Sequence, residues 1–326
     1  MKAGERAKLG RTSLSVTRFG LGTAPLAGLY EAVPEDQALA VISRAWDAGI
    51  RHFDTAPLYG FGRAEMRLGK ALRDKPREDF VLASKVGRLL RADAPPEPGQ
   101  NFQGTPPVNP VFDFSYDGVM RSVDESLERL HLGRIDILHI HDPDNHYDDA
   151  IRGAYKALDR LRSEGVVQAV GAGMNQAEML ARFAREGNFD CFLLAGRYTL
   201  LDQVALDELL PICVERGVAI IAAGVYNSGI LADPKPGARY NYTAAPDPLL
   251  ERARQIRAVC DSHGVPLKAA AVQFPLGHPS VSCVVVGCRS VDQLDESIRM
   301  FGVDIPPALW QELKAKGLLR EDAPTP

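Results

Sequence analysis

The sequence lacks the cysteine patterns, long apolar stretches and basic charge that mark disulfide-rich, membrane and nucleic-acid-binding proteins. Its five cysteines are odd in number and scattered, without the spacing of a C-x-x-C motif or a metal site. No uninterrupted apolar stretch approaches the ~20 residues that span a bilayer. The formal net charge of -4 provides no basic field for nucleic acid or an anionic membrane. We therefore expect reduced thiols and no nucleic-acid or membrane partner.

Signals for targeting and for covalent chemistry are missing as well. Residues 1–8, Met-Lys-Ala-Gly-Glu-Arg-Ala-Lys, are too charged for a signal peptide, and no apolar region of that kind follows. The chain has neither a G-x-S-x-G nucleophile motif nor a P-loop. We expect a cytoplasmic protein whose chemistry does not use a nucleophilic side chain.

Short apolar strands alternate with amphipathic helices about eight times, which favours an α/β fold of the (β/α)8 TIM barrel type as one domain over residues 1–326. A turn at residues 10–12 predicts a small N-terminal β-hairpin before a first strand that ends near Gly22. A doubly wound open sheet is the alternative, but no G-x-G-x-x-G follows the first strand. The later strands are expected at 52–54, 80–85, 135–141, 166–171, 191–195, 218–223 and 283–286, and the helices at 34–48, 62–73, 116–130, 148–163, 176–186, 204–216, 248–263, 266–274 and 291–300.

Two long irregular segments follow predicted strands. Residues 88–115 are rich in proline, glycine and asparagine, and residues 226–247 contain Asn-Ser-Gly-Ile-Leu before a mixed Pro/Tyr/Asn stretch. Loops of this length are usually functional lids or disordered segments. Because both follow strand ends, we expect them to close over a ligand; mobile surface insertions are the alternative.

Polar residues gather at the carboxyl ends of three successive predicted strands. Asp54 and Tyr59 follow one strand, Lys85 ends the next, and His141 ends the third. In a barrel these ends meet at one rim, where active sites lie. A lysine beside the phenol lowers its pKa from about 10 toward neutrality, which suits proton exchange with a carbonyl oxygen. A Lys–Asp pair that only braces the barrel is the alternative.

The strand that ends at His141 carries a second histidine on the same face. Strand alternation places His139 one layer deeper, where we expect a hydrogen-bonded core role, while a neutral His141 orients the substrate oxygen. The competing interpretation of His-x-His is metal binding, but no further ligand stands at suitable spacing. We expect no metal. Proton transfer without a nucleophile or metal points to hydride transfer by a nicotinamide cofactor.

Along almost its whole length the chain resembles the aldo-keto reductase superfamily. The motifs D-T-A-x-x-Y-G, S-K-V-G and L-x-I-H occur in the family's order and spacing after the N-terminal hairpin. The resemblance implies a barrel that binds NAD(P)H without a Rossmann domain. It also implies a catalytic tetrad in which Tyr59 is the acid/base, Lys85 and Asp54 tune it, and His141 orients the substrate.

The cofactor residues implied by the resemblance follow several strands. They are Gly22, Thr23, Asn175, Ser228, Gly229, Leu231, Gly287, Arg289, Ser290, Gln293 and Glu296. Gly173 and Met174 replace the usual polar pair after the fifth strand, and Ala223 or Gly224 stands where many members have a stacking tyrosine. Lysine and arginine, frequent in strict NADPH enzymes, are absent at positions 287 and 293, so we expect NAD as the preferred cofactor and NADP as the alternative.

Substrate choice is indicated by Asp142, which follows His141 where many aldehyde reductases have tryptophan. A carboxylate suits a ligand with hydroxyls; a helix cap or solvated loop acid is the alternative. His-Asp-Pro-Asp resembles the branch of D-threo-aldose (L-fucose or galactose) 1-dehydrogenases and pyridoxal 4-dehydrogenases. This implies oxidation of an aldose anomeric hydroxyl, or the pyridoxal hemiacetal, to a lactone, with Tyr30 and Asp142 at the substrate.

Two other functions stay open from the sequence. One is a broad NADPH-dependent aldehyde or ketone reductase, and the other is a catalytically weak, cofactor-sensing binding protein. In each enzymatic case the partner is a small-molecule sugar or aldehyde, and we expect a monomer or a weak homo-oligomer.

Overall fold

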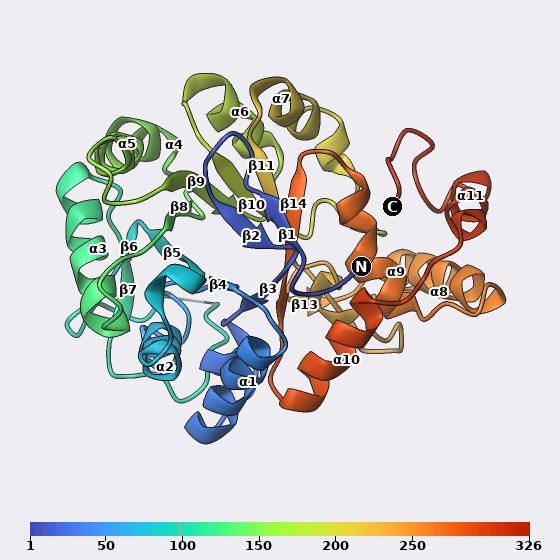
Figure 1. Cartoon of the computed structure of the whole chain (residues 1–326), viewed down its shortest axis with the longest axis horizontal. Coiled ribbons are helices and arrows are strands. Elements are labelled where there is room, and N and C mark those ends of the chain that lie inside the picture. Colours follow the sequence, from blue (N-terminus) through green and yellow to red (C-terminus); the bar gives the residue numbers. More distant parts are fainter. Residues whose placement is uncertain (98) are drawn as a thin grey trace.

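Eight parallel strands close into a barrel in the computed structural model, which describes residues 1–97 and 99–326 (Figure 1). Strand β14 pairs with β3, so the sheet has no open edge, and the expected (β/α)8 barrel is confirmed over the open-sheet alternative. The barrel strands in order are β3 (Phe19–Gly22), β4 (His52–Asp54), β5 (Val81–Val86), β8 (Ile137–His141), β9 (Ala169–Met174), β10 (Cys191–Ala195), β11 (Ala219–Ala223) and β14 (Val281–Gly287).

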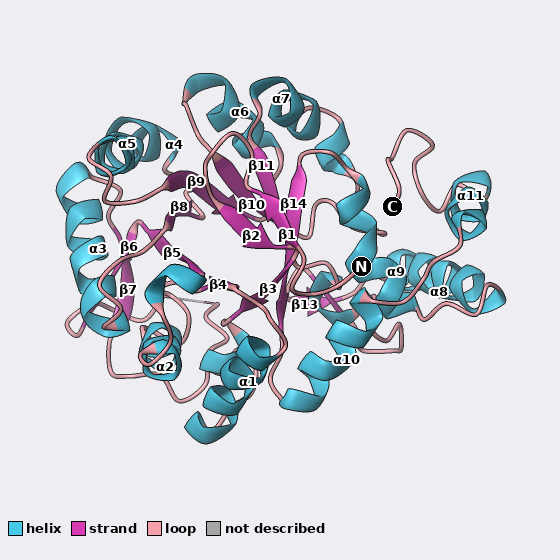
Figure 2. Cartoon of the chain, in the orientation of Figure 1, coloured by secondary structure: helices cyan, strands magenta, loops and turns pink. Residues whose placement is uncertain are grey.

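Helices surround the barrel and cover the outer faces of its strands (Figure 2). They are α1 (Glu35–Asp47), α2 (Arg63–Leu72), α3 (Tyr116–Leu130), α4 (Tyr147–Asp149), α5 (Tyr155–Ser163), α6 (Glu178–Glu186), α7 (Leu209–Arg216), α8 (Asp247–Ser262), α9 (Leu267–Gln273), α10 (Val291–Phe301) and α11 (Pro307–Ala315). Because both faces of the sheet are covered, the strands are apolar without alternation. No helix in the described part of the chain is long and apolar enough to cross a membrane.

Four elements differ in particular from the sequence-based expectation. The expected helix 148–163 contains a π-helical segment at Ala150–Ala154, and the expected helix 204–216 is divided into a 3₁₀ turn (Val204–Leu206) and α7. Strand β9 begins at Ala169 rather than at 166, because Val166 is exposed and follows the left-handed Gly165. Helix α11 has no counterpart among the expected elements.

The expected N-terminal hairpin is present and closes one end of the barrel. Strands β1 (Arg6–Lys8) and β2 (Ser15–Thr17) pair antiparallel. Gly10 turns between them with φ of 54°, and a Cβ there would lie 2.7 Å from the Gly217 carbonyl oxygen. Leu9, Leu14 and Val16 pack with the apolar residues of the barrel interior. Ligands can therefore reach only the opposite end, where the strands have their carboxyl termini.

The two long loops have secondary structure of their own. Within residues 88–115, β6 (Arg88–Arg91) and β7 (Asn109–Phe112) form a hairpin, and Phe102 bridges to Leu29. After β11, a 3₁₀ turn at Asn227–Gly229 leads to a second hairpin of β12 (Arg239–Tyr240) and β13 (Thr243–Ala244). Both loops therefore lie at the open end of the barrel.

Candidate active site

A buried ion pair lies at the centre of the open end. Asp54 ends β4, and Lys85 lies on the neighbouring β5. The Lys85 ammonium lies 2.9 Å from each Asp54 carboxylate oxygen and 2.9 Å from the Thr55 carbonyl oxygen. These three acceptors match the three N–H donors of the lysine, so a buried charge is fully partnered.

Tyr59 reaches this pair from the turn that follows β4. The Lys85 ammonium lies 4.5 Å from the centre of its ring, and the His141 ring meets it edge to face at a centroid distance of 5.7 Å. Burial raises the pKa of Tyr59 well above its usual value, and the carboxylates of Asp54 and Asp142 add to the rise. The expected fall of this pKa toward neutrality is therefore not found in the free protein, because burial and the two carboxylates outweigh the lowering effect of nearby positive charge.

The two histidines of β8 differ in their surroundings. His141 is buried at the end of the strand, and desolvation together with the Lys85 charge lowers its pKa well below the usual value, so the imidazole is neutral. His139, one layer deeper, pairs in register with Lys85. Neither of its ring nitrogens has a hydrogen-bond partner among the described residues, so a hydrogen-bonded core role is not supported. The described residues contain no group of three or more His, Cys, Asp or Glu side chains that could hold a metal ion.

Asp142 adds a carboxylate next to the catalytic candidates. Its Oδ2 atom lies 3.5 Å from His141 Nε2 and 3.8 Å from a guanidinium nitrogen of Arg88. Arg88 in turn donates to both carboxylate oxygens of Glu97 at 3.2 Å and stacks on Phe112. Burial raises the pKa of Asp142 to about 6. The first hairpin loop is thus connected through Arg88 to the residue that follows His141.

A cleft of about 560 Å³ opens beside Tyr59 and continues along the carboxyl ends of β11 and β14 to α10. Ten of the sequence-predicted residues line it: Gly22, Tyr30, Asp54, Tyr59, Ser228, Gly229, Gly287, Arg289, Gln293 and Glu296. Gly22 and Gly287 pack closely against this wall, because a Cβ at Gly22 would lie 3.0 Å from Val285 and one at Gly287 would lie 2.7 Å from Pro25. Seven of the eleven residues expected to hold a nicotinamide cofactor therefore line one cleft.

Other predicted residues lie at the edge of this cleft or behind its wall. Lys85, His141 and Asp142 lie close to Tyr59 but are not among the residues that line the cleft. Thr23 donates both its N–H and its hydroxyl to the Asp54 carbonyl oxygen at 3.0 Å, and therefore braces β4. Leu231 is fully buried in the core. Asn175, directly after β9, and Ser290, which caps α10, likewise lie outside the lining.

The structure also brings in residues that the sequence reasoning missed. Tyr242, from the second hairpin, lines the cleft, as do Lys268 of α9 and Ser297 of α10. Lys268 forms an ion pair of 2.8 Å with Glu296. Only the position of 226–247 after a strand pointed toward Tyr242, and no local signal distinguished Lys268 from other helix lysines.

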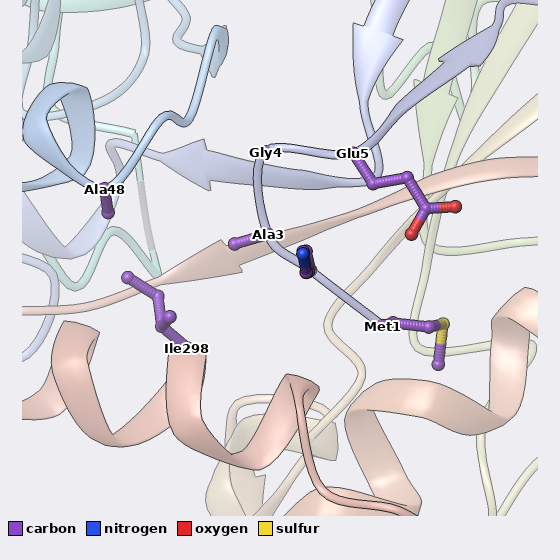
Figure 3. Close-up of a pocket in the computed structure, with 7 residues that line it drawn as sticks. Met1, Ala3, Gly4, Glu5, Ala48 and Ile298 are labelled. Atoms are coloured by element: carbon purple, nitrogen blue, oxygen red, sulfur yellow. The ribbon is translucent and has the colours of Figure 1, made fainter.

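A second hollow lies away from this region, beside the N-terminal segment and α10 (Figure 3). Its lining includes Met1, Ala3, Ala48 and Ile298 but none of the predicted site residues. The cleft beside Tyr59 is therefore the candidate active site.

Comparison with known proteins agrees with this geometry. A model of the Aldo/keto reductase family matches residues 18–317. Pyridoxal 4-dehydrogenase of Microbacterium luteolum is 43% identical over 98% of this chain and 99% of its own length. D-threo-aldose 1-dehydrogenase of a Pseudomonas species is 44% identical over 96% of each chain. The fold is similar to that of an aldo-keto reductase from Bacillus halodurans in its holo form, with a TM-score of 0.78 and 25% identity over 97% of this chain and 96% of that one.

The family match and the two dehydrogenases extend over nearly the whole chain, so the likeness is not limited to the barrel scaffold. Members of this family are oxidoreductases that use nicotinamide cofactors, and the chain belongs to the aldo/keto reductase family.

Proposed function

We propose that the protein oxidises a cyclic hemiacetal, either an aldose at its anomeric carbon or the pyridoxal hemiacetal, to a lactone. The hydride leaves the hemiacetal carbon, and the nicotinamide of a bound NAD⁺ supplies its acceptor. Tyr59 takes the proton of the hemiacetal hydroxyl, so that the C–O bond becomes the lactone carbonyl. The neutral His141 donates to the same oxygen and orients it.

The observation that carries this proposal is the position of the Asp142 carboxylate, which is paired with Arg88 but accepts no hydrogen bond from the described side chains. It lies beside His141 and Arg88, yet both contacts exceed hydrogen-bond length, at 3.5 and 3.8 Å. The Asp142 side chain is 21% exposed, and no described residue donates a hydrogen bond to its carboxylate, so a substrate hydroxyl next to the reacting carbon can donate to it. An apolar aldehyde has no such donor. The names of the two dehydrogenases at 43% and 44% identity support the same class of substrate.

Two cations at the far end of the cleft support NAD over NADP. Lys268 is paired with Glu296 at 2.8 Å. Arg289 donates to the Leu29 carbonyl oxygen at 3.1 Å and lies 4.0 Å from Glu31. A 2′-phosphate would have to compete with these acceptors for its charge partner, whereas the 2′-hydroxyl of NAD would not. We therefore propose that Arg289, Gln293 and Glu296 hold the adenosine end of NAD.

A steady-state screen tests the proposal. L-fucose, D-arabinose, D- and L-galactose and pyridoxal are oxidised with NAD⁺ or NADP⁺, and simple aldehydes are reduced with NADH or NADPH, while cofactor absorbance is followed. We expect rapid NAD⁺ reduction with at least one hemiacetal. Activity restricted to NADPH and apolar aldehydes would replace the proposal by a broad reductase. Tight cofactor binding with no appreciable turnover would favour a cofactor-sensing protein.

A further inference from the structure

Two tyrosines of the cleft have a backbone conformation that few side chains adopt. Tyr30 has a φ of 67° and Tyr242 a φ of 66°, and both line the cleft beside Tyr59. The left-handed region is disfavoured for bulky residues, and residues held there gather at active sites and ligand clamps. These two positions therefore call for an explanation in terms of a ligand.

The conflict between conformation and residue type is sharpest at Tyr242. Tyr240 and Thr243 are register partners in the hairpin, so Asn241 and Tyr242 form its two-residue turn. Both have positive φ, which is the pattern of a type I′ turn. Such turns favour Asn-Gly, so asparagine suits its place and tyrosine does not. The ring at position 242 is therefore not explained by the turn.

The contacts of the turn hold Tyr242 at the cleft that it lines. Its backbone N–H donates to the Ser228 hydroxyl at 3.1 Å, and the Asn241 side chain accepts from Arg197 at 3.0 Å. The side chain is 48% exposed overall. Burial nevertheless raises the pKa of its hydroxyl, with contributions from Tyr59 and Asp142. Tyr242 is thus half-exposed and lines the same cleft as Tyr30 and Tyr59.

Tyr30 contributes to the wall of the same cleft from the segment after β3. The Arg239 guanidinium lies over its ring at 4.4 Å, and its backbone N–H donates to the Asn101 carbonyl oxygen at 2.8 Å. Its hydroxyl is buried and has no partner among the described residues. Tyr30 is therefore fixed in place and has an unused hydrogen-bonding group.

We propose that Tyr242 stacks on the ring of a cyclic substrate while the Tyr30 hydroxyl bonds one of its polar groups. The site then selects the ring-closed hemiacetal over an open-chain aldehyde. This inference rests on the proposed function and assigns its ring specificity to the second hairpin. Contact between two aromatic rings, as with pyridoxal, contributes roughly 2- to 12-fold in affinity, and we use the same range as the expectation for a sugar ring.

The test is Tyr242→Gly, which removes the ring but keeps the N–H bond to Ser228 and suits the turn. With the best hemiacetal substrate we expect KM to rise more than 2-fold and up to about 12-fold, and kcat to change less than 2-fold. We expect the affinity for NAD⁺, measured by protein fluorescence, and the KM of propionaldehyde in the reducing direction to stay within 2-fold. Thermal stability should not decrease, because the residue no longer opposes the turn.

Asn241→Gly is the matched control, since it changes the same turn without removing a residue of the cleft lining. It should leave the KM of the hemiacetal unchanged. The inference is overturned if Tyr242→Gly leaves this KM within 2-fold, or if NAD⁺ affinity falls as much as substrate affinity. Failure of the proposed function is distinct, because the wild-type protein would then oxidise no hemiacetal.

Discussion

Replacing Asp142 by asparagine tests the proposed substrate contact while conserving side-chain shape. A hydrogen bond to a charged group contributes about 1.5–3 kcal/mol, whereas one between neutral groups contributes about 0.5–1.5 kcal/mol. The change from carboxylate to amide should therefore cost roughly 1–2 kcal/mol of transition-state binding, which is about 5- to 30-fold in kcat/KM. An apolar aldehyde makes no such bond and should be reduced by the variant as well as by the wild type.

The pH dependence gives this prediction a second readout. Because burial raises the pKa of Asp142 to about 6, the carboxylate is ionised at neutral pH and becomes protonated as the pH falls through that value. Oxidation that requires an ionised Tyr59 already loses activity with falling pH. Protonation of Asp142 should steepen this loss below about pH 6 in the wild type. Asp142→Asn should lack the steeper segment.

The groups around Asp142 support this assignment of the acid segment. His141, the nearest titratable neighbour, has a pKa well below its usual value and stays neutral. The Arg88 charge opposes the rise in the pKa of Asp142, and Asp144 and Glu97 add to it. The assay is kcat/KM for the best hemiacetal from pH 4.5 to 8. A variant within 2-fold of the wild type that keeps the steeper segment would refute the reasoning.

The same shift predicts an effect on stability with a defined sign. The pKa of Asp142 rises from an ordinary 3.8 to about 6, so the folded state holds this proton more firmly than the unfolded chain. The associated stability is present below about pH 4 and is lost as the pH rises through about 6. Its size is at most roughly 3 kcal/mol, since about 1.4 kcal/mol corresponds to one unit. Asp142→Asn should lack this loss, which urea unfolding at pH 4 and pH 7 would measure.

Three further outcomes follow from the Tyr59 and Lys85 geometry. Tyr59→Phe should reduce kcat by about 10²-fold or more while NAD⁺ affinity changes less than 2-fold. Steady-state turnover and a cofactor titration measure these two quantities. Activity above a few per cent of the wild type contradicts the acid/base role. Because burial raises the pKa of Tyr59, oxidation should increase with pH into the alkaline range, and a bell centred at neutral pH would contradict this. Lys85→Met leaves Asp54 buried without its partner and should lower the free energy of unfolding by about 3–5 kcal/mol, whereas a loss below 1 kcal/mol in urea would contradict the pair's importance.

The sequence was sufficient for the barrel and for the meeting of the tetrad candidates. Asp54 and His141 end their strands and Lys85 lies one residue before the end of β5, and strand ends in a parallel barrel share one rim by geometry alone. That inference needs no knowledge of side-chain packing. It therefore survived errors in element bounds, such as the three-residue shift of β9 to Ala169–Met174.

What depended on burial and on loop conformation could not be predicted in the same way. The direction of the Tyr59 pKa shift depends on burial and on the charges of Asp54 and Asp142, and His139 lacks the partner that its depth suggested. Tyr242 reaches the cleft only because its hairpin folds back to Ser228, fourteen residues earlier in the chain. Lys268 lines the cleft through the packing of α9 beside α10.

Asp142 has two opposing effects on the reaction, which the alkaline end of the pH profile can separate. Its carboxylate offers an acceptor to a substrate hydroxyl, but its charge is also one of the causes that raise the pKa of Tyr59. Asp142→Asn should therefore bind the substrate less well and yet ionise Tyr59 at lower pH.

At neutral pH the second effect compensates part of the first, so a single measurement there underestimates the lost contact. At a pH above the Tyr59 transition, this phenol is ionised in both the wild type and the variant. The ratio of their kcat/KM values then reports only the contact between Asp142 and the substrate hydroxyl. We expect the wild-type advantage to grow toward high pH and the transition of the variant to lie lower. A transition at the same pH in both proteins would show that the Asp142 charge does not change the pKa of Tyr59.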